Sequence, residues 1–63
     1  MYARTYFRML WDELSRQGFH ELARSVEKAC STHSLFELPQ GVKLPAGIRT
    51  LAEQANWCLQ HEG

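Results

Sequence analysis

Two short motifs carry the side chains with the clearest capacity for chemistry. Cys30 and His33 form one Cys-x-x-His pair, and Cys58 and His61 form a second. Two thiols and two imidazoles are a donor set that tetrahedral zinc accepts. Two observations argue against a zinc site: the stretch between the pairs, residues 34–57, is longer than in usual zinc fingers, and both cysteines lie on or near apolar stripes, where a free cysteine acts as a small buried hydrophobe. We therefore expect core cysteines, no metal and no cofactor, with a small zinc-stabilised module, a disulfide or a redox role as the alternatives.

No spacing in the sequence indicates catalysis. An active site needs a nucleophile, a base and an orienting group, or paired carboxylates in a pocket. Serine, histidine and aspartate all occur, but no spacing in the sequence brings them together. Short helices also cannot enclose a pocket of several hundred cubic ångströms. We expect neither an enzyme nor a catalytic residue.

Length and charge limit the class of protein. The chain has 63 residues, which allows one domain spanning 1–63. Seven basic residues balance seven acidic ones, so no strong field attracts nucleic acid or a membrane surface. The longest apolar runs, such as residues 9–11, are too short to span a membrane, and Arg4 and Arg8 interrupt any signal-peptide pattern. Two cysteines are too few for a secreted disulfide framework, and we expect a cytosolic protein.

Apolar periodicity predicts an all-α fold. The spacing indicates helices over about Tyr2–Gln17, Phe19–Cys30 and Pro45–Gln60. Gly18 is suited to a left-handed cap, so the first two helices should form a hairpin. We expect a small three-helix domain, in which an apolar loop follows the hairpin and the third helix packs across it.

The loop between the second and third helices is unusually apolar. Ser34 to Glu37 has capping-box spacing, and Pro39 limits any helix there to about one turn. We expect several of its apolar side chains to plug the open side of the hairpin, and these are Leu35, Phe36, Leu38, Val42 and Leu44.

Large aromatic side chains exceed what these helices can hide. The apolar residues of the first helix cover about half its circumference, which is more than one neighbouring helix can cover. Trp57 lies on the polar face of the third helix. Tryptophan and tyrosine dominate interface hot spots because a large rigid area is buried at low entropic cost. The predicted partner-binding residues are therefore Tyr2, Tyr6, Phe7, Trp11 and Trp57.

These features indicate a small regulatory or inhibitory protein. Small size, a helical pattern and uncovered aromatics are the general profile of phage- or plasmid-encoded inhibitors and of bacterial anti-activators. We expect a cytosolic protein as partner and a homodimer as the form of the free chain, because a core this small gains stability from association.

The alternative is a DNA-binding regulator resembling a helix-turn-helix. Gln17 and Gly18 would form its turn, and the second helix would present His20, Arg24, Ser25 and Lys28 to DNA. Glu21 and Glu27 interrupt that face, and the connection that follows is too long for the motif. We expect no nucleic-acid partner.

Overall fold

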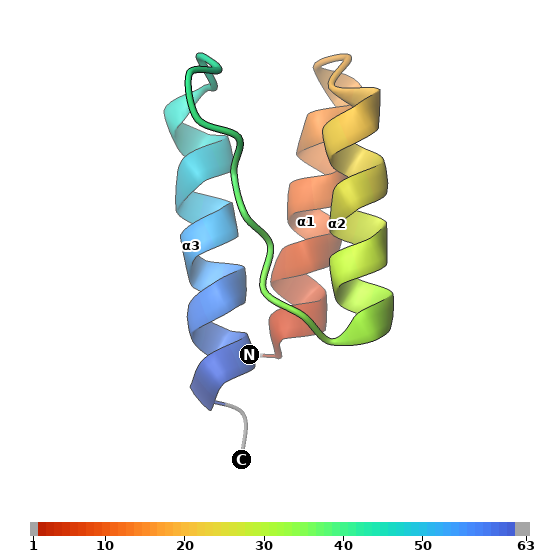
Figure 1. Ribbon diagram of the computed structural model, residues 1–63, viewed down its shortest axis with the longest axis vertical. Coiled ribbons are helices and arrows are strands. Elements are labelled where there is room, and N and C mark those ends of the chain that lie inside the picture. Colours follow the sequence, from red (N-terminus) through yellow and green to blue (C-terminus); the bar gives the residue numbers. More distant parts are fainter. Residues whose placement is uncertain (1, 62–63) are drawn as a thin grey trace.

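The computed structural model describes residues 2–61, and within that range it contains three helices and no strand. They are α1 (Ala3–Arg16), α2 (His20–Thr32) and α3 (Ala46–His61) (Figure 1). Each bound lies within two residues of the sequence-based prediction, and the largest difference is that α2 continues to Thr32. The all-helical prediction is confirmed for the described residues.

Left-handed residues end the first two helices in the same way. Gly18 has a φ of 87°, as predicted, and the Phe19 N–H donates to the Leu14 carbonyl at 2.8 Å. After α2, His33 has a φ of 56°, and the Ser34 N–H donates to the Ala29 carbonyl at 2.9 Å. These are the long-range bonds of a Schellman motif, which satisfies carbonyls that the helix leaves unpaired.

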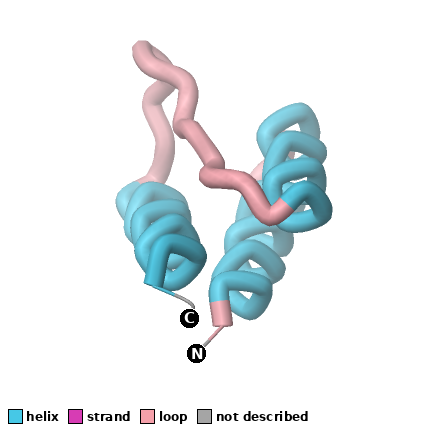
Figure 2. Tube along the Cα trace, turned by 60° about the horizontal axis from the view of Figure 1, so that its bottom comes forward, coloured by secondary structure: helices cyan, strands magenta, loops and turns pink. Residues whose placement is uncertain are grey.

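Helix α1 is the centre of the arrangement. It runs antiparallel to α2 and to α3, and it packs against both of them, whereas α2 and α3 do not contact each other (Figure 1). The prediction that the third helix packs across the hairpin is therefore corrected: α3 lies alongside one member of the hairpin only. The connection 33–45 runs back along the length of the molecule between α2 and α3 (Figures 1 and 2).

The position of α1 explains the width of its apolar face. Two helices cover it from two directions, so Phe7, Leu10 and Leu14 are almost completely buried. The rest of the core comes from all three helices and from the connection, namely Ala3, Ala23, Val26, Ala29, Phe36, Ile48, Ala52, Ala55 and Cys58.

Phe36 is the residue of the connection that enters the core, and it is 4% exposed. Leu38 and Leu44 pack against the core and are half-buried, whereas Leu35 and Val42 are exposed. The connection thus plugs the gap beside the hairpin with part of the predicted apolar set. Residues 34–37, which have capping-box spacing, form no helical turn, and that segment is extended along the bundle.

Asn56 of α3 holds the connection in place. The Phe36 N–H donates to Asn56 Oδ1 at 2.8 Å, and Asn56 Nδ2 donates to the Phe36 carbonyl at 2.8 Å. Both backbone groups of the buried residue are therefore paired by one side chain, as a neighbouring strand would pair them. No local sequence pattern marks Asn56 for this role.

None of the helices within residues 2–61 has the length and apolar character that a membrane crossing requires.

Candidate partner-binding surface

The five predicted partner-binding residues lie in different surroundings. The exposed fractions of Tyr2, Trp57 and Trp11 are 75%, 57% and 37%. Tyr6 is half-buried against the core, and Phe7 is 2% exposed. Phe7 therefore offers almost no surface to another molecule, whereas both indoles and Tyr2 do.

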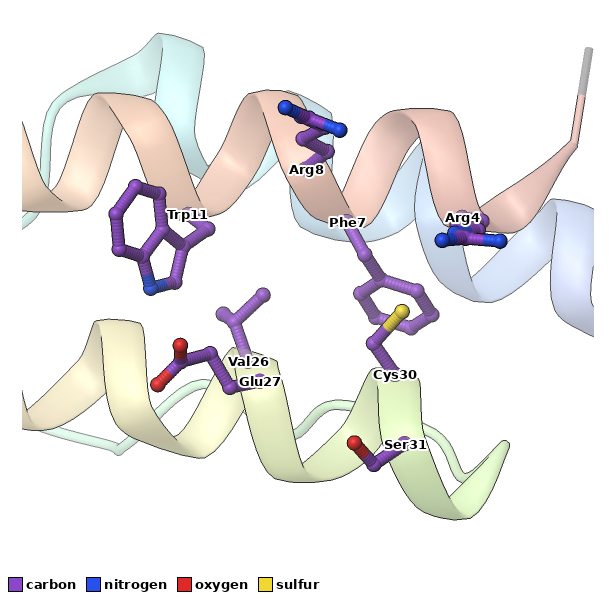
Figure 3. Close-up of a pocket in the computed structure, with 8 residues that line it drawn as sticks. All are labelled: Arg4, Phe7, Arg8, Trp11, Val26, Glu27, Cys30 and Ser31. Carbon is purple, nitrogen blue, oxygen red and sulfur yellow. The ribbon is translucent and has the colours of Figure 1, made fainter.

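Trp11 borders a shallow groove between α1 and α2, with a volume of about 400 Å³ (Figure 3). Its floor is formed by Phe7 of α1 and Val26 of α2, which are both almost fully buried. The complete lining is Arg4, Phe7, Arg8 and Trp11 from α1 with Val26, Glu27, Cys30 and Ser31 from α2. The groove thus combines an apolar floor with polar walls and an aromatic ring at its edge.

A second hollow adjoins this groove at the end of the bundle. It shares Arg4, Phe7, Cys30 and Ser31 with the first and adds Leu59 of α3. The two hollows share four lining residues and are therefore neighbours along the bundle.

The charges on the groove walls are not neutralised by neighbouring side chains. Arg4 and Arg8 lie one helical turn apart on α1, with the Arg8 side chain at the outer rim and directed away from α2, and Glu27 lies on α2 across the groove (Figure 3). Among the described residues none of the three forms an ion pair. The ion pairs of α1 are those of Arg16, whose guanidinium lies 3.1 Å from Asp12 and 3.5 Å from Glu13. Asp12 and Arg16 lie one helical turn apart, which is the spacing of an i,i+4 ion pair.

Trp57, by contrast, does not border a groove between two helices. Its indole stacks on the His61 imidazole, with ring centroids 4.2 Å apart and an interplanar angle of 17°. His61 Nδ1 is also 2.8 Å from the Trp57 carbonyl oxygen, to which it donates when that nitrogen carries the proton. The hollow beside the indole is lined by Trp57, Glu53 and Gln54 of the same helix. Trp57 therefore borders a polar stretch of one helix, without an apolar floor.

The four residues of the zinc alternative do not converge. Cys58 is buried in the core, and Cys30 is half-buried at the groove; both are free thiols. In the part of the chain that the structure describes, no three histidine, cysteine, aspartate or glutamate side chains lie close enough to hold a metal ion. His61, moreover, is engaged with Trp57.

The hairpin also differs from a helix-turn-helix. In that motif the two helices cross at about 90–120°, whereas α1 and α2 lie side by side and antiparallel (Figure 1). The exposed residues of α2 include both signs of charge, namely His20, Glu21, Arg24, Ser25, Glu27 and Lys28.

Comparisons of the chain with protein-family models, with curated proteins and with solved structures find no match. Any assignment of function therefore rests on the surface described above.

Proposed function

We propose that this chain is a small regulatory or inhibitory protein that acts by binding another protein, and that the partner docks on the α1–α2 groove beside Trp11. The observation that carries the proposal is the combination at one place of an exposed indole, an apolar floor and charged walls. Protein interfaces have this anatomy: an apolar centre with aromatic anchors and a polar rim.

The size of the domain supports the same conclusion. Domains of this length bury a smaller fraction of their surface than larger ones, so additional burial on a partner contributes substantially to stability. Trp11 keeps over a third of its surface in water, and a partner that covered it would gain the area of a rigid ring. Tyr2 and Trp57 are secondary contacts in this proposal, because neither lines the groove.

The sequence also led us to expect a homodimer, which would cover exposed aromatic surface outside the groove, such as Trp57. A second copy would hide one exposed indole from each chain. The native mass of the free protein, measured by sedimentation equilibrium, distinguishes self-association from binding to a different protein.

The proposal is tested by comparing two tryptophan variants as tagged baits in a lysate of the source cells. Trp11→Ala should lose the partner that the wild type retains, and Trp57→Ala should retain most of it. Truncation of a central aromatic anchor typically costs about 2 kcal/mol or more, which is roughly a thirtyfold loss of affinity. Circular dichroism of each variant shows that the helices remain. Equal capture by wild type and Trp11→Ala would overturn the proposal.

A further inference from the structure

Resting on the proposed function, we infer that the groove binds an amphipathic helix of the partner, which carries two acidic residues one turn apart on the flank facing Arg4 and Arg8. Three features of the groove indicate the chemistry of its occupant: its shape, its apolar floor and the charges that its walls leave unpaired.

The shape of the groove suits a single helix. Its walls are residues 4–11 of α1 and 26–31 of α2, which form two ridges about 10 Å long, enough to seat two to three turns of a helix. A neighbouring hollow, lined in part by Leu59, lies beside this groove. A helix laid between two others packs its side-chain ridges into their grooves, which is a recurrent mode of peptide recognition.

The floor determines the face of the incoming helix. Phe7 and Val26 lie beneath the groove, and Trp11 stands at its edge. Because Phe7 and Val26 expose only 2% and 1% of their surface, an apolar stripe on the partner would mainly cover Trp11 and the aliphatic stems of the wall residues. A polar stripe would leave its donors and acceptors unpaired against this floor.

The walls determine the flanks of that helix. Arg4 and Arg8 have the i, i+4 spacing at which side chains on one helix face are neighbours. Neither has a carboxylate partner within residues 2–61. A second helix with carboxylates one turn apart matches this pair, and guanidinium and carboxylate groups form paired hydrogen bonds. Glu27, on the opposite wall, favours a lysine or arginine on the other flank, so the charges fix the direction of the helix.

A second copy of the chain fits this groove less well. Two grooves facing each other would bring four guanidinium groups and two carboxylates together, because each wall pair contributes Arg4, Arg8 and Glu27. The excess of positive charge opposes that contact, whereas an acidic helix neutralises it. We therefore assign the groove to a different protein.

The test is a selection from a peptide library, so the charges on the flanks of the bound helix are not chosen in advance. A display library of amphipathic helices of about 16 residues, with a fixed leucine stripe and randomised flanks, is selected on the purified full chain. We expect aspartate or glutamate to be enriched at two positions one turn apart on one flank. Selection on Arg4→Glu/Arg8→Glu should replace them by lysine or arginine, and Arg4→Gln/Arg8→Gln should abolish the bias.

A matched control makes the same change of charge elsewhere. Arg24 and Lys28 are exposed and also one turn apart, but they lie on α2 outside the groove lining. Selection on Arg24→Glu/Lys28→Glu should keep the acidic bias. A fluorescein-labelled peptide from the wild-type selection should bind the Arg4→Glu/Arg8→Glu protein at least about tenfold more weakly than this control.

The outcomes separate the inference from the proposed function. Trp11-dependent helices without an acidic bias would overturn the inference and leave the proposed function standing. A wild-type dimer that Arg4→Glu/Arg8→Glu dissociates would show that a second copy occupies the groove, and it would also overturn the inference. A library that yields no binder above the Trp11→Ala background overturns the inference, and if lysate capture is also independent of Trp11, the proposed function fails with it.

Discussion

The two sides of α2 differ in what covers them. Toward α3, where no helix makes contact, the connection 33–45 lies in the gap and inserts Phe36 into the core. Toward α1 the groove stays open, with Phe7 and Val26 beneath it. A plug needs an apolar side chain and also partners for the backbone that carries it, and Asn56 supplies those partners on the covered side. Within residues 2–61 no segment covers the groove.

The covered side is broken most directly at Phe36. Phe36→Ala should destabilise the protein by about 3–5 kcal/mol, because it leaves a cavity where a buried ring stood. That is comparable to the whole stability expected of so small a core. Urea denaturation followed by circular dichroism measures the change, with Leu35→Ala, at the exposed neighbouring position, as the control. A similar loss in both variants would show that the connection is not a plug.

Substitution of Asn56 tests how much its hydrogen bonds to the Phe36 backbone contribute to stability. Asn56→Ala should cost about 1–3 kcal/mol, because both amide bonds to Phe36 are lost and its part-buried N–H and carbonyl are left without partners. Hydrogen exchange at the Phe36 amide should accelerate more than exchange within α1. Gln54→Ala, at an exposed position of the same helix, should leave both readouts nearly unchanged.

The open side depends on the turn that joins its two walls. Gly18→Ala should cost about 1–2 kcal/mol, because an alanine at a φ of 87° is strained even though its Cβ would meet no neighbour within 4 Å. Gly47→Ala is the informative counterpart: its Cβ also meets no atom, and the residue lies in α3. The free energy of unfolding of that variant, measured by thermal unfolding, should rise by about 0.5–1 kcal/mol. Equal effects of the two would refute the left-handed role of Gly18.

The smallest effect on stability is expected at the rim of the groove. Arg4→Gln/Arg8→Gln should change the free energy of unfolding by less than about 0.5 kcal/mol, because neither exposed guanidinium has an ion-pair partner among the described residues. Chemical denaturation of the double variant beside the wild type measures this. A loss above about 1 kcal/mol would mean that these arginines serve the fold and are not kept for a partner.

Local patterns predicted the helices well. Apolar periodicity located all three within two residues, and Gly18 marked the first turn, because each signal lies in a few consecutive residues. The left-handed residue after α2 was missed, since His33 takes a conformation that a sequence pattern assigns to glycine or asparagine. The capping-box spacing from Ser34 to Glu37 does not begin a helix: the segment is extended along the bundle, and Phe36 is buried in the core.

Features of the surface that depend on long-range contacts could not be predicted from the sequence. Nothing in the neighbourhood of Phe36 or of Asn56 indicates that they are bonded to each other across the fold. Phe7 and Trp11 belong to one apolar face in the sequence, but two neighbouring helices bury the first and leave the second at an edge. The excess of aromatic residues can be read from the sequence, whereas the groove beside Trp11 depends on how α2 lies against α1.

The central position of α1 has a consequence for the order of folding. Only residues 17–19 separate α1 from α2, whereas 33–45 must be ordered before α3 can dock, and closing the longer connection costs on the order of 1 kcal/mol more entropy. Because α3 touches α1 and not α2, the hairpin can come together without it. We expect the first two helices to pair before the third docks, so the walls of the groove meet early in folding.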